Sequence, residues 1–151
     1  MIICNTIDKY DIHYFHNCDP IKNSIIPNGK FYRLLYSSKN YTMNNIYCIL
    51  NYNSISYEKI DNQKHKYKLN FLPETILHIK HVEEQLLKKI NCNNARRSQL
   101  KITEQLSNDY VKILDYKLSA MNNLKVLLKI SGIWENESQC GLTFKIIICN
   151  G

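Results

Sequence analysis

The segment from Leu124 to Cys149 constrains the fold most, because two apolar runs flank a short polar stretch at Glu135–Gln139. Both runs are rich in aliphatic and β-branched residues, a composition that predicts an antiparallel β-hairpin. Successive side chains point to opposite faces of a strand, so each arm should carry one apolar face and one lysine-bearing face. Such a hairpin suits a sheet that buries one face and offers the other to a polyanion.

Residue parity divides the predicted hairpin into its two faces. Strict alternation gives an apolar face of Leu124, Val126, Leu128, Ile130, Trp134, Leu142, Phe144, Ile146 and Ile148. The opposite face carries Lys125, Leu127, Lys129, Ser131, Thr143, Lys145 and Ile147. A bulge at Gly132 would instead turn Trp134 towards the lysine face, so both directions stay open for this residue.

The remaining chain reads as short strands around one helix. Period-two patterns predict strands at Ile2–Thr6, Ile12–Phe15, Phe31–Tyr36, Ile46–Tyr52 and Lys64–Phe71. Apolar residues at steps of three and four predict an amphipathic helix over Pro73–Ile90. The segment 95–108 fits a basic loop or a short helix, and Tyr110–Leu118 fits a strand or a helical turn. We expect a mainly β domain over residues 1–151, built as a β-barrel of the oligonucleotide-binding (OB) type, with the helix between core strands and the C-terminal hairpin closing it.

The charge balance indicates an anionic partner. The 151 residues include 20 Lys and Arg against 13 Asp and Glu, a formal net charge of +7, which favours nucleic acid. Motifs for phosphate loops, serine hydrolases, zinc proteases and dinucleotide binding are missing, so we expect no enzyme and no cofactor. His13, His16 and Cys18 have the right chemistry for metal ligands, but a second pair is missing and we expect no metal site.

Basic and aromatic residues interleave along the chain in a way that is typical of single-strand binding, where cations follow phosphates and rings stack on bases. The predicted phosphate contacts are Arg33, Lys39, Lys64, Lys66, Lys68, Arg96, Arg97, Lys125, Lys129 and Lys145. The predicted stacking residues are Tyr32, Tyr36, Tyr41 and Tyr47, with Trp134 added if the bulge turns it outward. The alternative for each tyrosine is a core position, because strands favour aromatic residues. The alternative for the lysines at 64, 66 and 68 is protection of a sheet edge.

Two segments, GKFYRLLYSSKNYTMNNIYCILN (29–51) and LKISGIWENESQCGLTFKI (128–146), resemble the signature regions of small single-stranded-DNA-binding proteins of large double-stranded DNA viruses, which are OB-fold relatives of the phage type. The resemblance implies sequence-independent protection of unwound DNA during replication, and it favours DNA over RNA. It also implies a location in the host nucleus or at a cytoplasmic replication site. Proteins of the phage type end in an acidic tail, which the residues Cys149-Asn150-Gly151 do not provide, so self-association at this edge is the expected alternative to polymerase recruitment.

Other features bear on location and on rival functions. The six cysteines form no C-x-x-C pair, and neither a secretory signal nor an apolar run of membrane-spanning length is present, so we expect a reducing intracellular location and no membrane partner. A viral structural or scaffold protein that makes protein contacts is the principal alternative. A metal-dependent catalyst built on His13, His16 and Cys18 is the third.

Overall fold

The computed structural model describes residues 4–23, 25, 28–59, 64–90, 95–108, 111–116 and 124–150, without the side chains at 23, 57, 59, 64, 65, 111–116 and 150. The described part is mainly β, as predicted, with two α-helices and two short 3₁₀ helices. The strands are β1 (Cys4–Thr6), β2 (Phe15–Asn17), β3 (Ile21–Asn23), β4 (Gly29–Ser37), β5 (Thr42–Asn44), β6 (Ile46–Leu50), β7 (Tyr52–Lys59), β8 (Lys64–Phe71), β9 (Arg97–Gln99), β10 (Val111–Tyr116), β11 (Leu124–Glu135) and β12 (Gln139–Asn150). The helices are α1 (Pro73–Ile90), α2 (Lys101–Ser107) and the 3₁₀ turns Ile7–Lys9 and Ile12–Tyr14.

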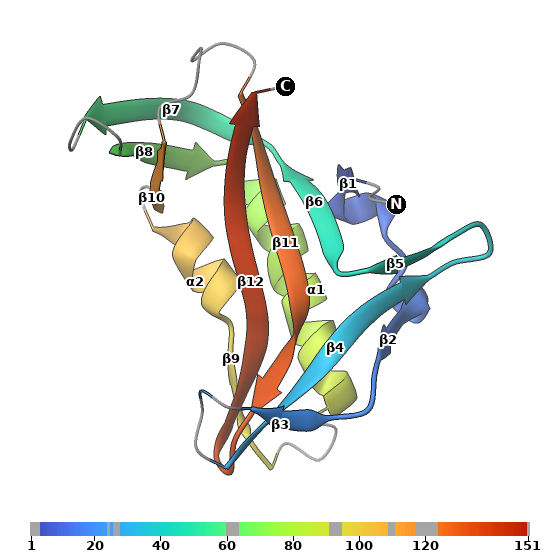
Figure 1. Ribbon diagram of the computed structural model, residues 1–151. Helices are drawn as coiled ribbons and strands as arrows, with labels where there is room; N and C mark the ends of the chain where they lie inside the picture. Colours follow the sequence, from blue (N-terminus) through green and yellow to red (C-terminus); the bar gives the residue numbers. More distant parts are fainter. Residues whose placement is uncertain are drawn as a thin grey trace.

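The larger of the two sheets is built around the long β11–β12 hairpin (Figure 1). Its strands follow the order β1-β6-β11-β12-β9, and β4 pairs with the opposite end of β11 from β6. Strands β2, β3 and β5 pair with β4. Strand β1 is parallel to β6 and β9 is parallel to β12, while the other pairs of this sheet are antiparallel. No pairing between the described strands closes this sheet into a ring.

The hairpin confirms the predicted alternation over most of its length. The even-numbered apolar residues from Leu124 to Ile130 are buried, as are Leu142, Ile146 and Ile148. The register shifts between Ile130 and Gly132 because a bulge lies there. Beyond the bulge the parity reverses, so the expectation from strict alternation is wrong for Trp134 and the bulged alternative holds: its neighbours Ile133 and Glu135 are buried instead.

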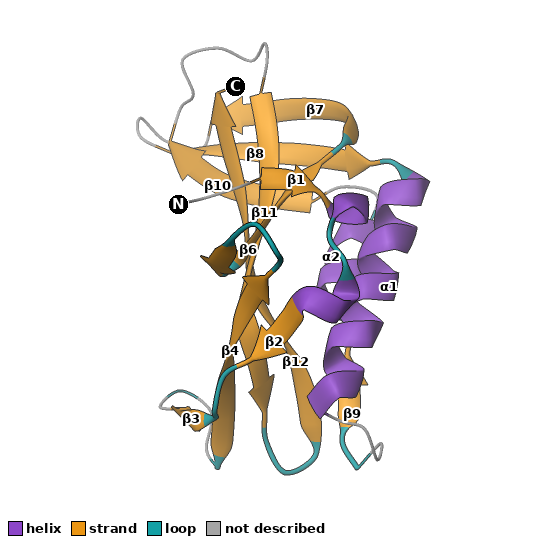
Figure 2. Ribbon diagram, turned by 90° about the vertical axis from the view of Figure 1, so that its right-hand side faces the viewer, coloured by secondary structure: helices purple, strands orange, loops and turns teal. Residues whose placement is uncertain are grey.

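Both α-helices pack on one face of the large sheet (Figure 2). We call this the inner face, and the opposite one the outer face. Helix α1 has the predicted bounds, and its buried positions Ile79, Leu86 and Leu87 lie at the spacing that an amphipathic helix requires. Apolar residues from both sheets and both α-helices form one buried cluster.

A second sheet of three strands, in the order β10-β8-β7, lies across the upper end of the hairpin (Figure 1). Strand β8 has the predicted bounds, and its alternate residues Tyr67, Leu69 and Phe71 are buried, as a period of two requires. The side chain of His65, which has the same parity, lies outside the described residues. Strand β7 was not predicted, because the segment after Tyr52 is too polar to show a period of two. Its antiparallel pairing with β8 makes it a strand.

Three local predictions are corrected or resolved by the structure. The expected strand Ile12–Phe15 is wrong, since Ile12–Tyr14 forms a 3₁₀ turn that starts where the Asp11 side chain accepts a hydrogen bond from the His13 N–H. The ambiguous segment 95–108 contains β9 and α2, so the short-helix alternative holds for its second half. The other ambiguous segment forms β10 over Val111–Tyr116.

Two further observations concern the oxidation state of the cysteines and the length of the helices. The five cysteines in the described ranges are free thiols: Cys4, Cys18, Cys48, Cys140 and Cys149. Among the helices of the described part, none has the length and apolar character needed to cross a bilayer.

The buried carboxylate of Glu83 joins the two α-helices. Its side chain on α1 is 1% exposed and accepts hydrogen bonds from the backbone N–H groups of Ile102 and Thr103, both at 3.0 Å, and from the Thr103 hydroxyl at 2.7 Å. These donors belong to the first turn of α2, whose own N-cap residue, Leu100, has no side chain that could accept them. Glu83 therefore supplies the capping interaction of α2 from a neighbouring helix.

We expect Glu83→Gln to lower the free energy of unfolding by about 2 kcal/mol at neutral pH, because an amide replaces one acceptor oxygen with a donor that faces backbone N–H groups. Burial raises the pKa of Glu83 in the folded state. The wild-type protein therefore loses stability as the pH rises from the ordinary value of a glutamate through this raised pKa, and it regains that stability on acidification. Urea unfolding of both proteins between about pH 4 and about pH 7 should show a gap that widens towards acid pH. A gap that narrows on acidification would contradict the raised pKa, because it would mean that the hydrogen bonds to the carboxylate outweigh its burial.

Candidate nucleic-acid interface

The outer face of the large sheet brings together seven of the predicted binding residues. Strand register and burial place the following side chains on it: Phe31, Arg33 and Leu35 of β4; Tyr47 and Ile49 of β6; Arg97 and Gln99 of β9; Lys125, Leu127, Lys129 and Trp134 of β11; and Thr143, Lys145, Ile147 and Cys149 of β12. No helix lies over this side of the hairpin in either view (Figures 1 and 2). The predicted residue Arg97 also reaches this face, through the parallel pairing of β9 with β12.

Two lysines lie directly opposite each other at the middle of the outer face. Lys129 of β11 is the cross-strand partner of Lys145 of β12, and Tyr47 of β6 continues the same row on the other side of Lys129. Like charges in directly opposed positions destabilise a strand pair. The pair thus reduces the stability of the sheet while concentrating positive charge at the centre of an open surface.

Acidic residues are missing from this face within the described strands. The outer face holds five cationic residues, Arg33, Arg97, Lys125, Lys129 and Lys145, none of which forms an ion pair with a described residue. Across the described strands of the large sheet the one acidic residue is Glu135, and it is buried on the inner face. All charged side chains on the described strands of this face are therefore positive, although the whole chain carries 13 acidic residues.

Two aromatic rings cover glycines at the end of the outer face nearest the hairpin tip. Trp134 is paired with Gly141 on one side and Phe31 on the other. A Cβ atom built on Gly141 would lie 2.8 Å from Trp134 Cζ2, and one built on Gly132 would lie 2.5 Å from Phe31 Cζ. Neither glycine has a positive φ, so these positions require glycine for space, not for backbone conformation. Phe31 was not among the predicted binding residues, although it lies in a segment that carries the family resemblance and its neighbours Tyr32 and Arg33 were predicted.

An aliphatic row crosses the outer face between the lysines. Ile49, Leu127 and Ile147 are aligned on β6, β11 and β12. All three are partly exposed, and none packs against the buried core cluster. The aliphatic side chains of this row therefore lie directly beside the lysines of the outer face.

The lysines of β8 do not join the outer face. Lys66 and Lys68 lie on the three-stranded sheet, where Lys66 is opposite Glu58 of β7 and Lys68 is opposite Ser56. That sheet shares no strand pairing with the large sheet in the described residues. Lys64 begins β8, but its side chain lies outside the described residues.

Tyr32 and Arg96 meet on the inner side of the sheet, around Glu135. The Tyr32 hydroxyl donates to Glu135 Oε1 at 2.7 Å, and Arg96 Nη1 lies 3.5 Å from Glu135 Oε2. Arg96 Nε also donates to the Asn136 carbonyl at 2.7 Å. Desolvation, followed by the hydrogen bond to Glu135, raises the pKa of Tyr32 to about 12. These two predicted binding residues thus connect β4 and the segment before β9 to the hairpin.

The other predicted aromatic residues are divided between the core and a turn. Tyr36 is 4% exposed, its ring lies within 5.0 Å and 5.1 Å of the ring centroids of Tyr10 and Phe15, and its hydroxyl accepts from the Asp11 N–H. Tyr36 is therefore a core residue in this fold, and its buried ring offers no face to a base. Tyr41 is partly buried against Tyr36. Lys39 is exposed in the turn before β5.

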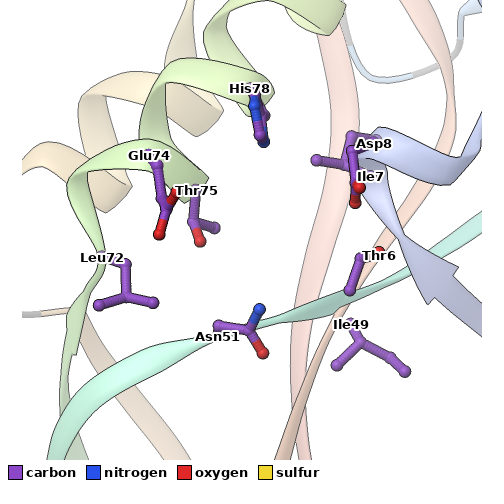
Figure 3. A pocket seen from close by; sticks show the side chains of 9 residues that line it. All are labelled: Thr6, Ile7, Asp8, Ile49, Asn51, Leu72, Glu74, Thr75 and His78. Carbon is purple, nitrogen blue, oxygen red and sulfur yellow. The ribbon is translucent and has the colours of Figure 1, made fainter.

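A polar pocket of about 210 Å³ lies between the N-terminal segment, β6 and the start of α1 (Figure 3). Its lining includes Asp8, Glu74 and His78, and the hydrogen bond from Thr6 lowers the pKa of Asp8. Two carboxylates give this pocket the opposite charge to the outer face, so it does not extend the cationic surface.

The metal-ligand types noted near the N-terminus are not assembled into a centre. His13 Nδ1 is 2.8 Å from Asp11 Oδ1, whereas His16 lies two residues beyond the 3₁₀ turn on β2. Within the described residues, no group of three or more His, Cys, Asp or Glu side chains is arranged to hold a metal ion.

Comparisons with known protein families, with curated proteins and with solved structures found no match to this chain.

Proposed function

We propose that the outer face of the large sheet binds single-stranded nucleic acid without reading its sequence. The observation that carries the proposal is the charge of this face, which has five cations and no acidic residue in its described strands. Cationic side chains release the counterions condensed on a nucleic-acid backbone, and the binding that results does not depend on base identity.

The opposed lysines support the same function. Lys129 and Lys145 repel each other in the unbound sheet. A phosphate placed between them would replace this repulsion with two attractive, charge-assisted contacts. The outer side of β12 extends over ten residue steps from Gln139 to Cys149, or about 33 Å, which is enough for the several nucleotides that single-strand sites occupy.

The proposed biological role follows the family resemblance. The chain would act as a non-catalytic OB-like protein that protects unwound viral DNA during replication, in the host nucleus or at a cytoplasmic replication site. The mainly β fold and the helix-free basic face of its long hairpin support this role.

A structural or scaffold role remains the second proposal, and the aliphatic row favours it. Ile49, Leu127 and Ile147 are partly exposed beside the lysines, and contiguous apolar surface is typical of protein interfaces. Another copy of the chain or a different protein would then cover the outer face. Such a protein would exist as a stable assembly in the absence of nucleic acid, which sedimentation measurements would detect.

Titration of a labelled mixed-sequence oligonucleotide by fluorescence anisotropy tests the nucleic-acid function. With five phosphate contacts, the affinity should fall about 100-fold between about 50 mM and about 200 mM salt, because each contact releases condensed counterions. A scrambled oligonucleotide of the same length should bind equally well. Absence of binding at the lower salt concentration, or affinity that does not respond to salt, refutes the proposal.

A further inference from the structure

We infer that Trp134 and Phe31 form a stacking subsite for two neighbouring unpaired bases, at the end of the outer face nearest the hairpin tip. This inference rests on the proposed function and specifies the ligand of one part of that face. In this arrangement the lysines of the outer face contact phosphates, and Trp134 and Phe31 stack on bases.

The glycine beneath Trp134 sets the orientation of the indole. The Cβ position of Gly141 is almost equally distant from three consecutive indole atoms: Cζ2 at 2.8 Å, Cε2 at 2.9 Å and Nε1 at 2.9 Å. Near-equal distances at this length place the Cβ position to one side of the ring plane, so the indole covers the glycine with part of its face. The opposite side of the indole is then turned away from the sheet.

Phe31 lies beside Trp134 in the same row of the sheet. The two residues are cross-strand partners, and neighbouring strands are about 4.8 Å apart. The end of the Phe31 ring lies against Gly132, with Phe31 Cζ and Cε2 at 2.5 Å and 2.8 Å from the glycine's Cβ position. Ile21, the partner of Phe31 on β3, is 55% exposed, so the apolar row stays open beyond the two rings.

Neither ring serves the core. Both Trp134 and Phe31 are partly exposed, and neither belongs to the residues that pack against the buried cluster. Exposed aromatic rings on a face that also carries five cations can stack on bases, and each stacked base contributes about 1–3 kcal/mol. Arg33 lies two residues from Phe31 on the same face of β4 and can bind the phosphate that joins two stacked bases.

The subsite also accounts for a preference for single strands. Bases in a duplex are already stacked on their neighbours and paired, so exposing their faces to a protein ring requires unstacking. An unpaired strand presents them directly. The cationic part of the outer face binds phosphates of either form, and Trp134 and Phe31 provide the discrimination.

Trp134 is the single tryptophan of the chain, so intrinsic fluorescence reports on the subsite without a label. We expect an oligothymidylate to change this fluorescence on binding. An abasic oligonucleotide of equal length should compete for the protein but leave the fluorescence unchanged. Trp134→Ala should lower the affinity for oligothymidylate about 10-fold and leave the affinity for the abasic strand unchanged.

The outcomes separate the subsite from the proposed function. If a labelled oligothymidylate binds with the expected salt dependence while the fluorescence of Trp134 stays constant, the subsite is wrong and the cationic interface stands. An equal fluorescence change with the abasic strand also overturns the subsite, because bases are then not needed. If no strand binds at low salt, both fail. The fluorescence titration uses the unmodified protein, so a folding defect in the Trp134→Ala variant would not prevent the test.

Discussion

The double variant Lys129→Glu, Lys145→Glu is expected to bind a single strand about 100-fold more weakly than the wild-type protein at about 50 mM salt. It removes two of the five outer-face cations and adds two anions at the same positions, so the summed charge of these five residues falls from +5 to +1. The remaining cations, Arg33, Arg97 and Lys125, lie nearer the ends of the face. The slope of affinity against salt should also decrease, by about 1.4 for two lost single-strand contacts.

A matched control separates local from global charge. Lys80→Glu with Lys88→Glu makes the same change in net charge, at two exposed positions of α1 on the opposite side of the large sheet. This control should retain most of the affinity, since charges more than about 10 Å apart across solvent are largely screened. Anisotropy titrations of both variants, with circular dichroism to confirm folding, decide the matter. Equal losses in both variants would mean that net charge, and not the outer face, governs binding.

Local periodicity was sufficient to predict several elements. The bounds of α1 and β8 and the parity of the hairpin up to Ile130 depend on the spacing of apolar residues within one segment. Strand β7 could not be found in this way, because the sequence Tyr52-Asn53-Ser54-Ile55-Ser56 becomes a strand through its pairing with β8. The face to which Trp134 points depends on the bulge between Ile130 and Gly132. The spacing of apolar residues is compatible with such a bulge but does not show whether one is present.

Strand pairing decides which residues lie on the outer face, so the amino-acid composition alone could not predict them. Tyr32, Arg33 and Tyr36 are close in sequence, yet alternation and packing send Tyr32 to Glu135, Arg33 to the outer face and Tyr36 to the core. The lysines of β8 share a pattern with the hairpin but belong to another sheet. The lack of acidic residues on the outer face becomes visible once the register of β4, β6, β9, β11 and β12 is known.

The substitution Gly132→Ala is expected to destabilise the fold by about 3 kcal/mol, the upper part of the range for overpacking a well-packed site. The new Cβ would collide with the backbone carbonyl oxygen of Tyr32 and would lie 2.5 Å from Phe31 Cζ. The carbonyl belongs to the β4 strand that pairs with β11 at this point, so the clash can be relieved only by a shift of the backbone. Urea unfolding monitored by circular dichroism measures the change in the free energy of unfolding.

Gly141→Ala is the matched control for this prediction, because its Cβ would meet only the Trp134 side chain among the nearest atoms, at 2.8–2.9 Å. A partly exposed indole can move outward more easily than a paired strand can, so Gly141→Ala should destabilise by about 1 kcal/mol. The two alanine variants therefore differ in which atoms must move: the β4 backbone for Gly132→Ala and the Trp134 ring for Gly141→Ala. A Gly132→Ala protein that is as stable as Gly141→Ala would show that β4 can separate from β11 at this bulge at little cost, and that the close approach of the two strands is not a requirement of the fold.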